Sequence, residues 1–198
     1  TESAWPRFSV VKDPGASGTH LGPLPSRAMA NLVVEALQSA LPLRRCSTRL
    51  AASHVPAPGA TPCSAAQLGV AMCPCAGDAD RRRYDAAVRA AVRVFDGDSS
   101  AVSEHLVARM AELAATQRFE EAAMVRDRLS ALLGAVRRQQ LIAALRAAGR
   151  CTVRSGDRSW VVDGARRMVE RHHSSAAFEA AVDTAVRSVL SRARRSST

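Results

Sequence analysis

The sequence predicts a mainly α-helical protein, and three observations carry this prediction. Apolar residues recur at three- and four-residue steps in several stretches. Gly- and Pro-containing segments interrupt these stretches, and four cysteines lie close together in one of the irregular segments. The chain has 198 residues, of which 47% are hydrophobic, so it can form the core of one domain or of two small ones.

The N-terminal part is expected to contain one short strand and one helix. Residues 7–11 have a strand-like composition and are followed by an Asp-Pro-Gly turn at 13–15. Ser26 suits the N-cap of a helix that runs to Leu41 and ends at Pro42. The expected apolar stripe of this helix comprises Met29, Leu32, Val33, Ala36, Leu37 and Ala40.

A loop and a second helix are expected next. Residues 47–62 contain three prolines and read as a loop. The helix is expected to begin near Asp78 or Asp80 and to end at the Asp-Gly-Asp sequence at 96–98. Its predicted apolar residues are Tyr84, Ala87, Val88, Ala91, Val92 and Phe95.

Two further helices are predicted to form an antiparallel hairpin, because residues 116–118 interrupt the apolar periodicity after about four turns. The stripes are Val102, Leu106, Met110 and Leu113 before the break, and Ala122, Val125, Leu129, Leu132, Leu133 and Val136 after it. Such a hairpin buries one face and leaves a second apolar strip for a partner. The second helix either continues past Gly134 to Gly149 or kinks at Gly134.

The hairpin resembles the UVR motif of the UvrC family, the nuclease subunit of the bacterial excinuclease. Its signature is complete, with Phe119, Glu120, Ala122, Ala123, Arg126 and Asp127. Upstream, residues 5–46 resemble the segment after the GIY-YIG nuclease core of UvrC, and residues 62–77 resemble its cysteine region. Proteins that fuse an exonuclease to UvrC-like segments share these landmarks.

The resemblance implies a division into a segment following a GIY-YIG core (1–45), a cysteine region (46–77), a helical region (78–149) with the hairpin at about 100–137, and an unassigned tail (150–198). It also implies a UvrB-like partner in DNA repair. The expected partner-binding residues are Leu106, Met110, Phe119, Glu120, Ala122, Ala123, Arg126, Asp127 and Leu129. In the tail, residues 159–162 suggest a strand, and residues 178–190 suggest a helix.

Four cysteines, Cys46, Cys63, Cys73 and Cys75, lie within thirty residues of one another, whereas Cys151 stands apart. In a cytosolic protein this clustering indicates a metal or redox site, and thiolates suit zinc or an iron–sulfur cluster. The resemblance implies a 4Fe–4S cluster on four cysteines. The family spacing after Cys63 places a cysteine at position 71, where this chain has Ala71. The alternative is that the cysteines are small buried hydrophobic residues.

No catalytic residues are predicted. A GIY-YIG centre needs two tyrosines, and this chain has one, Tyr84, in a predicted helix. Two-metal chemistry needs convergent carboxylates, whereas the acidic residues here are scattered among arginines. We therefore expect a UvrC-like fragment that couples a nuclease to UvrB. The alternatives are part of an excinuclease or exonuclease fusion with its catalytic sites elsewhere, and a UVR-hairpin regulatory adaptor with a metal knot.

Net charge and hydropathy complete the sequence-based expectations. A formal net charge of +10 favours weak, non-specific DNA binding, although a protein of a G+C-rich genome also becomes rich in Arg. No apolar run has the roughly 18 residues of a membrane span, and no signal pattern is visible, so we expect a cytoplasmic protein. The start at Thr1 without Met suggests a fragment or a processed chain.

Overall fold

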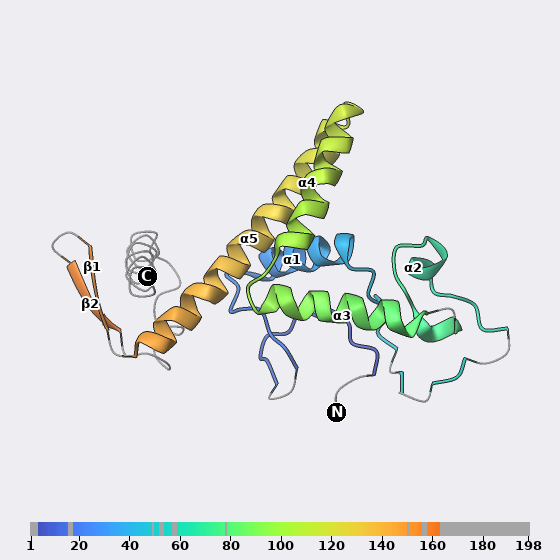
Figure 1. Cartoon of the computed structure of the whole chain (residues 1–198), viewed down its shortest axis with the longest axis horizontal. Coiled ribbons are helices and arrows are strands. Elements are labelled where there is room, and N and C mark those ends of the chain that lie inside the picture. Colours follow the sequence, from blue (N-terminus) through green and yellow to red (C-terminus); the bar gives the residue numbers. More distant parts are fainter. Residues whose placement is uncertain are drawn as a thin grey trace, which may run out of the picture. The chain divides into compact units, whose positions relative to one another are not determined.

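A computed structural model describes most of the chain as a set of helices followed by a small β-hairpin (Figure 1). The described residues are 4–15, 18–48, 50–51, 54–56, 59–77, 79–149, 151–155 and 158–162. The elements are α1 (Arg27–Ala40), α2 (Ser64–Gln67), the 3-10 helix η1 (Pro74–Ala76), α3 (Arg81–Phe95), α4 (Ser100–Ala115), α5 (Phe119–Ala148), β1 (Cys151–Ser155) and β2 (Arg158–Val162). The mainly α class is confirmed. The chain is divided into two compact units, residues 1–136 and residues 137–198.

The N-terminal segment differs from the sequence-based prediction. Residues 7–11 form no strand, because the described part of the first unit offers no second strand with which they could pair. Aromatic contacts with α3 hold the segment instead. Trp5 lies edge-on to Tyr84 with ring centroids 4.9 Å apart, and Phe8 lies 6.3 Å from Phe95. The segment therefore covers α3 rather than extending a sheet.

The boundaries of α1 and α3 follow from their N-caps, as the sequence predicted. The Ser26 hydroxyl accepts a hydrogen bond from the N–H of Met29, and Asp80 caps α3 through two backbone N–H groups. The prediction that Val92 belongs to the buried face of α3 was wrong. Val92 is exposed, and Val94 is buried in its place, because the buried positions follow three- and four-residue steps from Tyr84.

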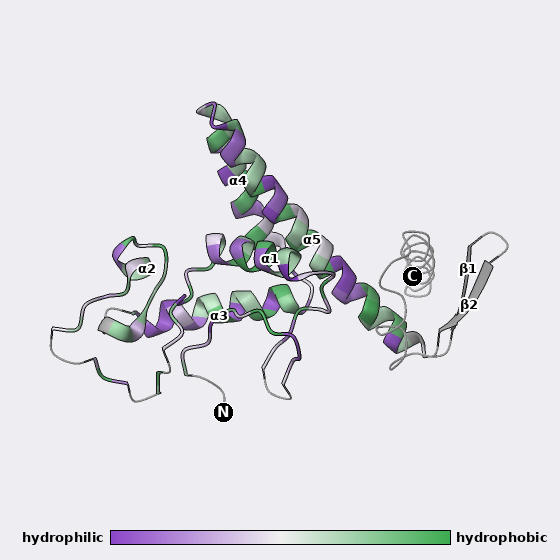
Figure 2. Ribbon diagram, turned by 180° about the vertical axis from the view of Figure 1, so that it is seen from behind, coloured by the Kyte–Doolittle hydropathy of each residue, from purple (hydrophilic) through white to green (hydrophobic). Residues whose placement is uncertain are grey.

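Helices α4 and α5 form the predicted hairpin, and they lie side by side in both ribbon views (Figures 1 and 2). A Schellman motif closes α4. The N–H of Arg118 donates to the carbonyl of Leu113, and the N–H of Gln117 donates to that of Ala114. Gln117 has a positive φ of 58°, which this motif requires at the residue after the cap. The motif fixes where the chain reverses.

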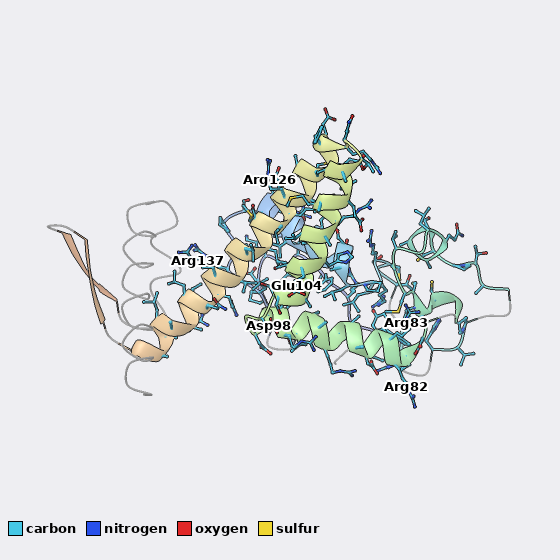
Figure 3. The ribbon with its side chains drawn as sticks, turned by 45° about the horizontal axis from the view of Figure 1, so that its top comes forward. Arg82, Arg83, Asp98, Glu104, Arg126 and Arg137 are labelled. Carbon is cyan, nitrogen blue, oxygen red and sulfur yellow. The ribbon has the colours of Figure 1, made fainter. Side chains whose placement is uncertain are left out.

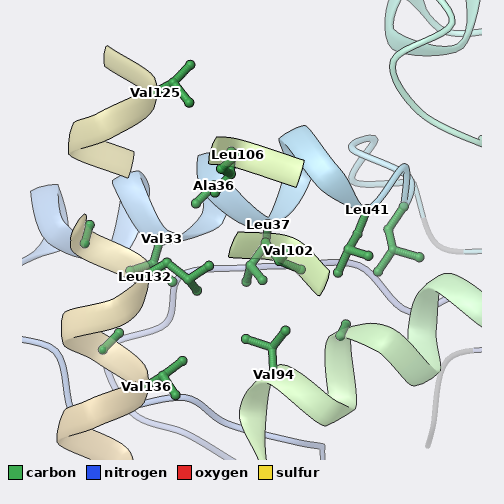
Figure 4. Close-up of a cluster of buried hydrophobic side chains, with 14 of the residues drawn as sticks. Val33, Ala36, Leu37, Leu41, Val94, Val102, Leu106, Val125, Leu132 and Val136 are labelled. Carbon is green, nitrogen blue, oxygen red and sulfur yellow. The ribbon is translucent and has the colours of Figure 1, made fainter. Parts of the chain in front are cut away.

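The hydrophobic core of the first unit combines residues of α1, α3, α4 and α5 (Figure 4). Leu37, Leu106 and Leu132 are almost completely buried in it. Leu133, also predicted as part of the α5 stripe, is 46% exposed. Leu132 and Leu133 are neighbours on a helix and point about 100° apart, so only one of them can face this core.

Helix α5 continues through Gly134 without interruption, which decides between the two predicted alternatives. After it, β1 and β2 pair as an antiparallel hairpin in which Val153 faces Trp160 in the register. This confirms the strand predicted at 159–162. The helix predicted at 178–190 lies outside the described residues. A bilayer span would need a longer or more apolar helix than any that the described residues form.

Replacing Gln117 with Gly should stabilise the first unit by about 1 kcal/mol, because a left-handed backbone conformation costs a residue with a side chain roughly this much. Urea unfolding followed by circular dichroism measures the change. Thr116→Gly is the matched control, because Thr116 has a negative φ of −94°. If both variants are destabilised equally, the account of Gln117 is wrong.

Candidate functional site

The clustered cysteines meet beside the N-terminal end of α3. Cys46 follows α1, Cys63 precedes α2, Cys73 precedes η1 and Cys75 lies within η1. The Sγ atoms of Cys63, Cys73 and Cys75 all lie within 4.8 Å of one another. The Sγ atom of Cys46 lies 3.2 Å from that of Cys73, and the Cys75 and Cys73 sulfurs are 3.0 Å apart. The four thiols therefore come from three segments, and those of Cys46, Cys63 and Cys75 surround that of Cys73.

Their environments affect the thiol pKa values in opposite directions. Hydrogen bonding from the backbone N–H of Ala66 lowers the pKa of Cys63, and the neighbouring thiols add to this effect. Burial raises the pKa of Cys73, which is 3% exposed. Without a cation, Cys73 is therefore a neutral thiol in this site. A metal ion would reverse this preference, since coordination stabilises thiolates.

The donor set suits a metal. Three sulfurs within mutual reach and a fourth in contact with one of them are soft ligands of the kind that hold zinc or iron–sulfur clusters. Ala71 occupies the position expected for a ligand, and Cys73 supplies the central thiol instead. The residues present therefore fit a thiolate-bound metal centre in spite of the altered spacing.

Arg44 adjoins this thiol group, and the sequence did not distinguish it from Arg45. Arg44 is 5% exposed, whereas Arg45 is exposed to solvent. The Arg44 guanidinium donates to the carbonyls of Trp5 at 2.6 Å, Thr48 at 2.6 Å and Cys46 at 3.2 Å. It also approaches the Cys46 sulfur at 3.6 Å. No pattern of the sequence signals which of two adjacent arginines is buried.

Tyr84 connects the same region to α3. Its hydroxyl accepts a hydrogen bond from the backbone N–H of Arg44 and donates one to the carbonyl of Pro6. Burial raises its pKa, so the phenol stays protonated. Arg81 lies over the Trp5 ring, 4.8 Å from its centroid. The sequence predicted Tyr84 as part of the apolar stripe of this helix, but it did not indicate the hydrogen bonds of its hydroxyl group.

The second candidate site is the outer face of α5, defined here as Phe119, Ala123, Arg126, Ser130 and Leu133. These residues follow one another at four- and three-residue steps, so they share one side of the helix. All are exposed except Ala123, which is half-buried, and Phe119 is 65% exposed. Arg126 lies on the side of α5 that faces away from α4 (Figure 3).

The other predicted partner-binding residues take different places. Leu106 and Ala122 are buried inside the chain, and Met110 and Leu129 are partly buried against the core. Glu120 and Asp127 are exposed beside the outer face, where Asp127 pairs with Arg126. Arg118 pairs with Glu121 through both guanidinium branches. Only part of the predicted set is therefore accessible to a partner.

Comparison with known protein families finds a match for each of the two regions that contain these candidate sites. The model of the UvrC/Cho excinuclease middle domain matches residues 1–94, and that of the UvrB/uvrC motif matches residues 102–134. The chain belongs to the UvrC family. The thiol group thus lies in the UvrC middle domain, and the outer face of α5 lies in the UVR motif.

Curated relatives agree with this membership. UvrABC system protein C of Natronomonas pharaonis is 35% identical over 64% of this chain and 21% of its own length. The same protein of Halobacterium salinarum is 34% identical over 65% of the chain and 21% of its length. A putative bifunctional exonuclease/endonuclease protein of Mycobacterium tuberculosis is 34% identical over 74% of the chain and 22% of its length. The chain spans about a fifth of these relatives. No solved structure matches it.

Proposed function

We propose that this UvrC-family region couples a DNA-repair nuclease to a UvrB-like protein through the outer face of α5. The observation that carries the proposal is the exposure of Phe119 at the head of this face, beside Ala123 and Arg126 of the UVR signature. A large aromatic side chain in water at a helix end gains free energy when a partner covers it.

The chemistry of the outer face indicates the kind of partner. Phe119 and Leu133 supply apolar area at the two ends, and the small residues Ala123 and Ser130 between them permit close approach of another helix. Arg126 with Asp127 supplies charges at the border. The matching motif bears the names of both UvrB and UvrC, which supports a second UVR hairpin as the partner.

Phe119→Ala should weaken binding to the C-terminal hairpin of a UvrB-like protein by about 2 kcal/mol, because a buried aromatic anchor commonly contributes this much. Isothermal titration calorimetry measures the affinity, and circular dichroism checks that helicity is retained. Leu68→Ala is the matched control, since Leu68 is an exposed apolar residue outside the hairpin. Equal affinities of both variants, or no binding by the unaltered chain, would contradict the proposal.

We also propose that Cys46, Cys63, Cys73 and Cys75 hold a metal centre, either a 4Fe–4S cluster or a zinc ion. The sulfur distances around Cys73 support this proposal. Such a centre would join the segments after α1, before α2 and around η1, which contain little other regular structure. Protein purified without oxygen should therefore contain iron and sulfide, or zinc.

DNA contacts are proposed for the second unit, because the positive charge is concentrated there. Residues 1–136 contain fifteen Lys and Arg residues against thirteen Asp and Glu residues, so they are almost neutral. Residues 137–198 contain thirteen Arg residues against five Asp and Glu residues. Arg recognises phosphate through paired hydrogen bonds, and a net excess of charge drives non-specific binding.

Replacing Arg154 and Arg158 of the β-hairpin with Gln should lower affinity for duplex DNA and reduce the salt dependence by about one unit per lost phosphate contact. Fluorescence anisotropy at several salt concentrations measures both effects. The control is the double replacement of Arg82 and Arg89 on α3, which removes the same charge from the almost neutral unit. If the control loses more affinity for duplex DNA than the variant of Arg154 and Arg158, the proposal of DNA contacts in the second unit is wrong.

We expect that the chain itself does not cleave DNA in the presence of Mg²⁺.

A further inference from the structure

Arg44 is a buried cation without an anionic partner among the described residues. The ion pairs in this part of the chain involve Arg81, Arg109, Arg118, Arg126 and Arg128, and none includes Arg44. Within the described ranges, the oxygen atoms that accept hydrogen bonds from its guanidinium are neutral backbone carbonyls. A guanidinium stays protonated at any physiological pH, so this charge must be balanced in some other way.

A buried charge destabilises a fold strongly unless an opposite charge is close. One candidate is the sulfur of Cys46, which lies 3.6 Å from the Arg44 guanidinium and itself touches the sulfur of Cys73. Neutral thiols would leave the guanidinium uncompensated. Four thiolates around a zinc ion, or around an oxidised 4Fe–4S core, carry a net charge of about −2 and would compensate it.

The same arginine contacts the N-terminal segment. Its Nε donates to the Trp5 carbonyl, and its backbone N–H donates to the Tyr84 hydroxyl, which in turn donates to the Pro6 carbonyl. Trp5 also lies against the Tyr84 ring and under Arg81. The position of residues 4–8 on α3 therefore depends on groups that meet at Arg44.

We propose that Arg44 is the counter-ion of the metal–thiolate centre and that, through Trp5 and Pro6, it couples metal binding to docking of the N-terminal segment on α3. This inference rests on the proposed metal centre. It assigns Arg44 a positioning role, since the guanidinium holds the loop of Cys46 through the carbonyls of Cys46 and Thr48. Partners of metal ligands that orient them in this way commonly change metal affinity tenfold to a hundredfold.

Three variants separate the charge of Arg44 from its hydrogen bonds. Arg44→Met removes both, and Arg44→Lys retains the charge but not the planar fork. Arg45→Met is the matched control, because Arg45 is the exposed neighbour and its guanidinium donates to the Gln38 carbonyl rather than to the thiol region. The protein is purified without oxygen, and its iron, sulfide and zinc contents and the rate of metal loss to a strong chelator are measured.

We expect Arg44→Met to lose metal at least about tenfold faster, Arg44→Lys to fall between Arg44→Met and the unaltered protein, and Arg45→Met to behave as the unaltered protein. Helicity by circular dichroism shows that the variants are folded. If Arg44→Met retains metal as well as Arg45→Met does, the counter-ion role is overturned and the metal centre stands. If the unaltered protein binds no metal, both proposals are overturned.

The fluorescence of Trp5 tests the second half of the proposal, which is the coupling between metal binding and docking of the N-terminal segment on α3. In a Trp160→Phe background, Trp5 is the only remaining tryptophan, since the chain contains two. Its quenching by acrylamide should increase severalfold when the metal is removed, and Arg44→Met and Arg44→Lys should show this increase even before removal. Metal removal that leaves the quenching unchanged in the unaltered protein would overturn the coupling, whatever the effect of Arg44 on metal affinity.

Discussion

Leu106→Ala should lower the free energy of unfolding by about 3 kcal/mol, because it creates a cavity in the centre of the first unit. Leu106 is 0% exposed and belongs to the same core as Leu37 and Leu132 (Figure 4). The cost of such a substitution includes both the lost burial of the side chain and the cavity that remains. Chemical denaturation followed by circular dichroism measures the change.

Val107→Ala is the matched control for this prediction. Val107 is the next residue on α4 and is 48% exposed, so its truncation should change stability by less than about 0.5 kcal/mol. The pair also tests the role of Leu106, which the family resemblance had placed at the partner surface. If Leu106→Ala left stability unchanged but abolished binding to a UvrB-like hairpin, the buried position of Leu106 would be wrong.

Cys73→Ala should abolish metal binding, with less than about a tenth of an equivalent remaining after purification without oxygen. Cys73 contacts both Cys46 and Cys75 through sulfur and lies within 4.8 Å of Cys63. Because it is the central thiol of the group, its loss removes the sulfur that Cys46 contacts and leaves only those of Cys63 and Cys75 within 4.8 Å of each other. Elemental analysis together with acid-labile sulfide measures the outcome.

Cys151→Ala is the control, since Cys151 belongs to β1 of the second unit and stands far from the other four cysteines in the sequence. It should retain the metal content of the unaltered protein. Moving the thiol by the double change Ala71→Cys and Cys73→Ala tests the spacing directly, because position 71 is where the family pattern expects a ligand. Full metal content in the Cys73→Ala single variant would favour simple buried thiols at this position.

Local signals in the sequence were sufficient to predict most of the helices and the helical hairpin of α4 and α5. Ser26 and Asp80 determine the starts of α1 and α3 because their side chains bond to N–H groups only two or three residues away. The end of α4 at residues 116–118 could be predicted for the same reason, because the hydrogen bond of the Schellman motif joins Leu113 to Arg118, only five residues away. Interactions of such short range are encoded where they occur, so one sequence is enough to find them.

The strand predicted at residues 7–11 does not form, because a strand depends on a partner that is distant in the sequence. A strand exists only if another strand is available to pair with it, and the composition of residues 7–11 contains no information about that. In the structure Phe8 packs near Phe95 and Trp5 lies against Tyr84. Of the apolar residues that suggested a strand, Phe8 is thus partly buried against α3, whereas Val10 and Val11 remain exposed.

For the functional sites, the sequence by itself determined which residue types are available: four clustered cysteines, and a complete UVR signature at Phe119 to Asp127. Only the tertiary structure decided which of these residues lie together and which are accessible to solvent. It placed Cys73 at the centre of the thiols, buried Arg44 but not Arg45, and turned Leu106 inward while leaving Phe119 exposed. Periodicity identifies an apolar residue but does not specify what covers it, since burial depends on elements that are distant in the chain.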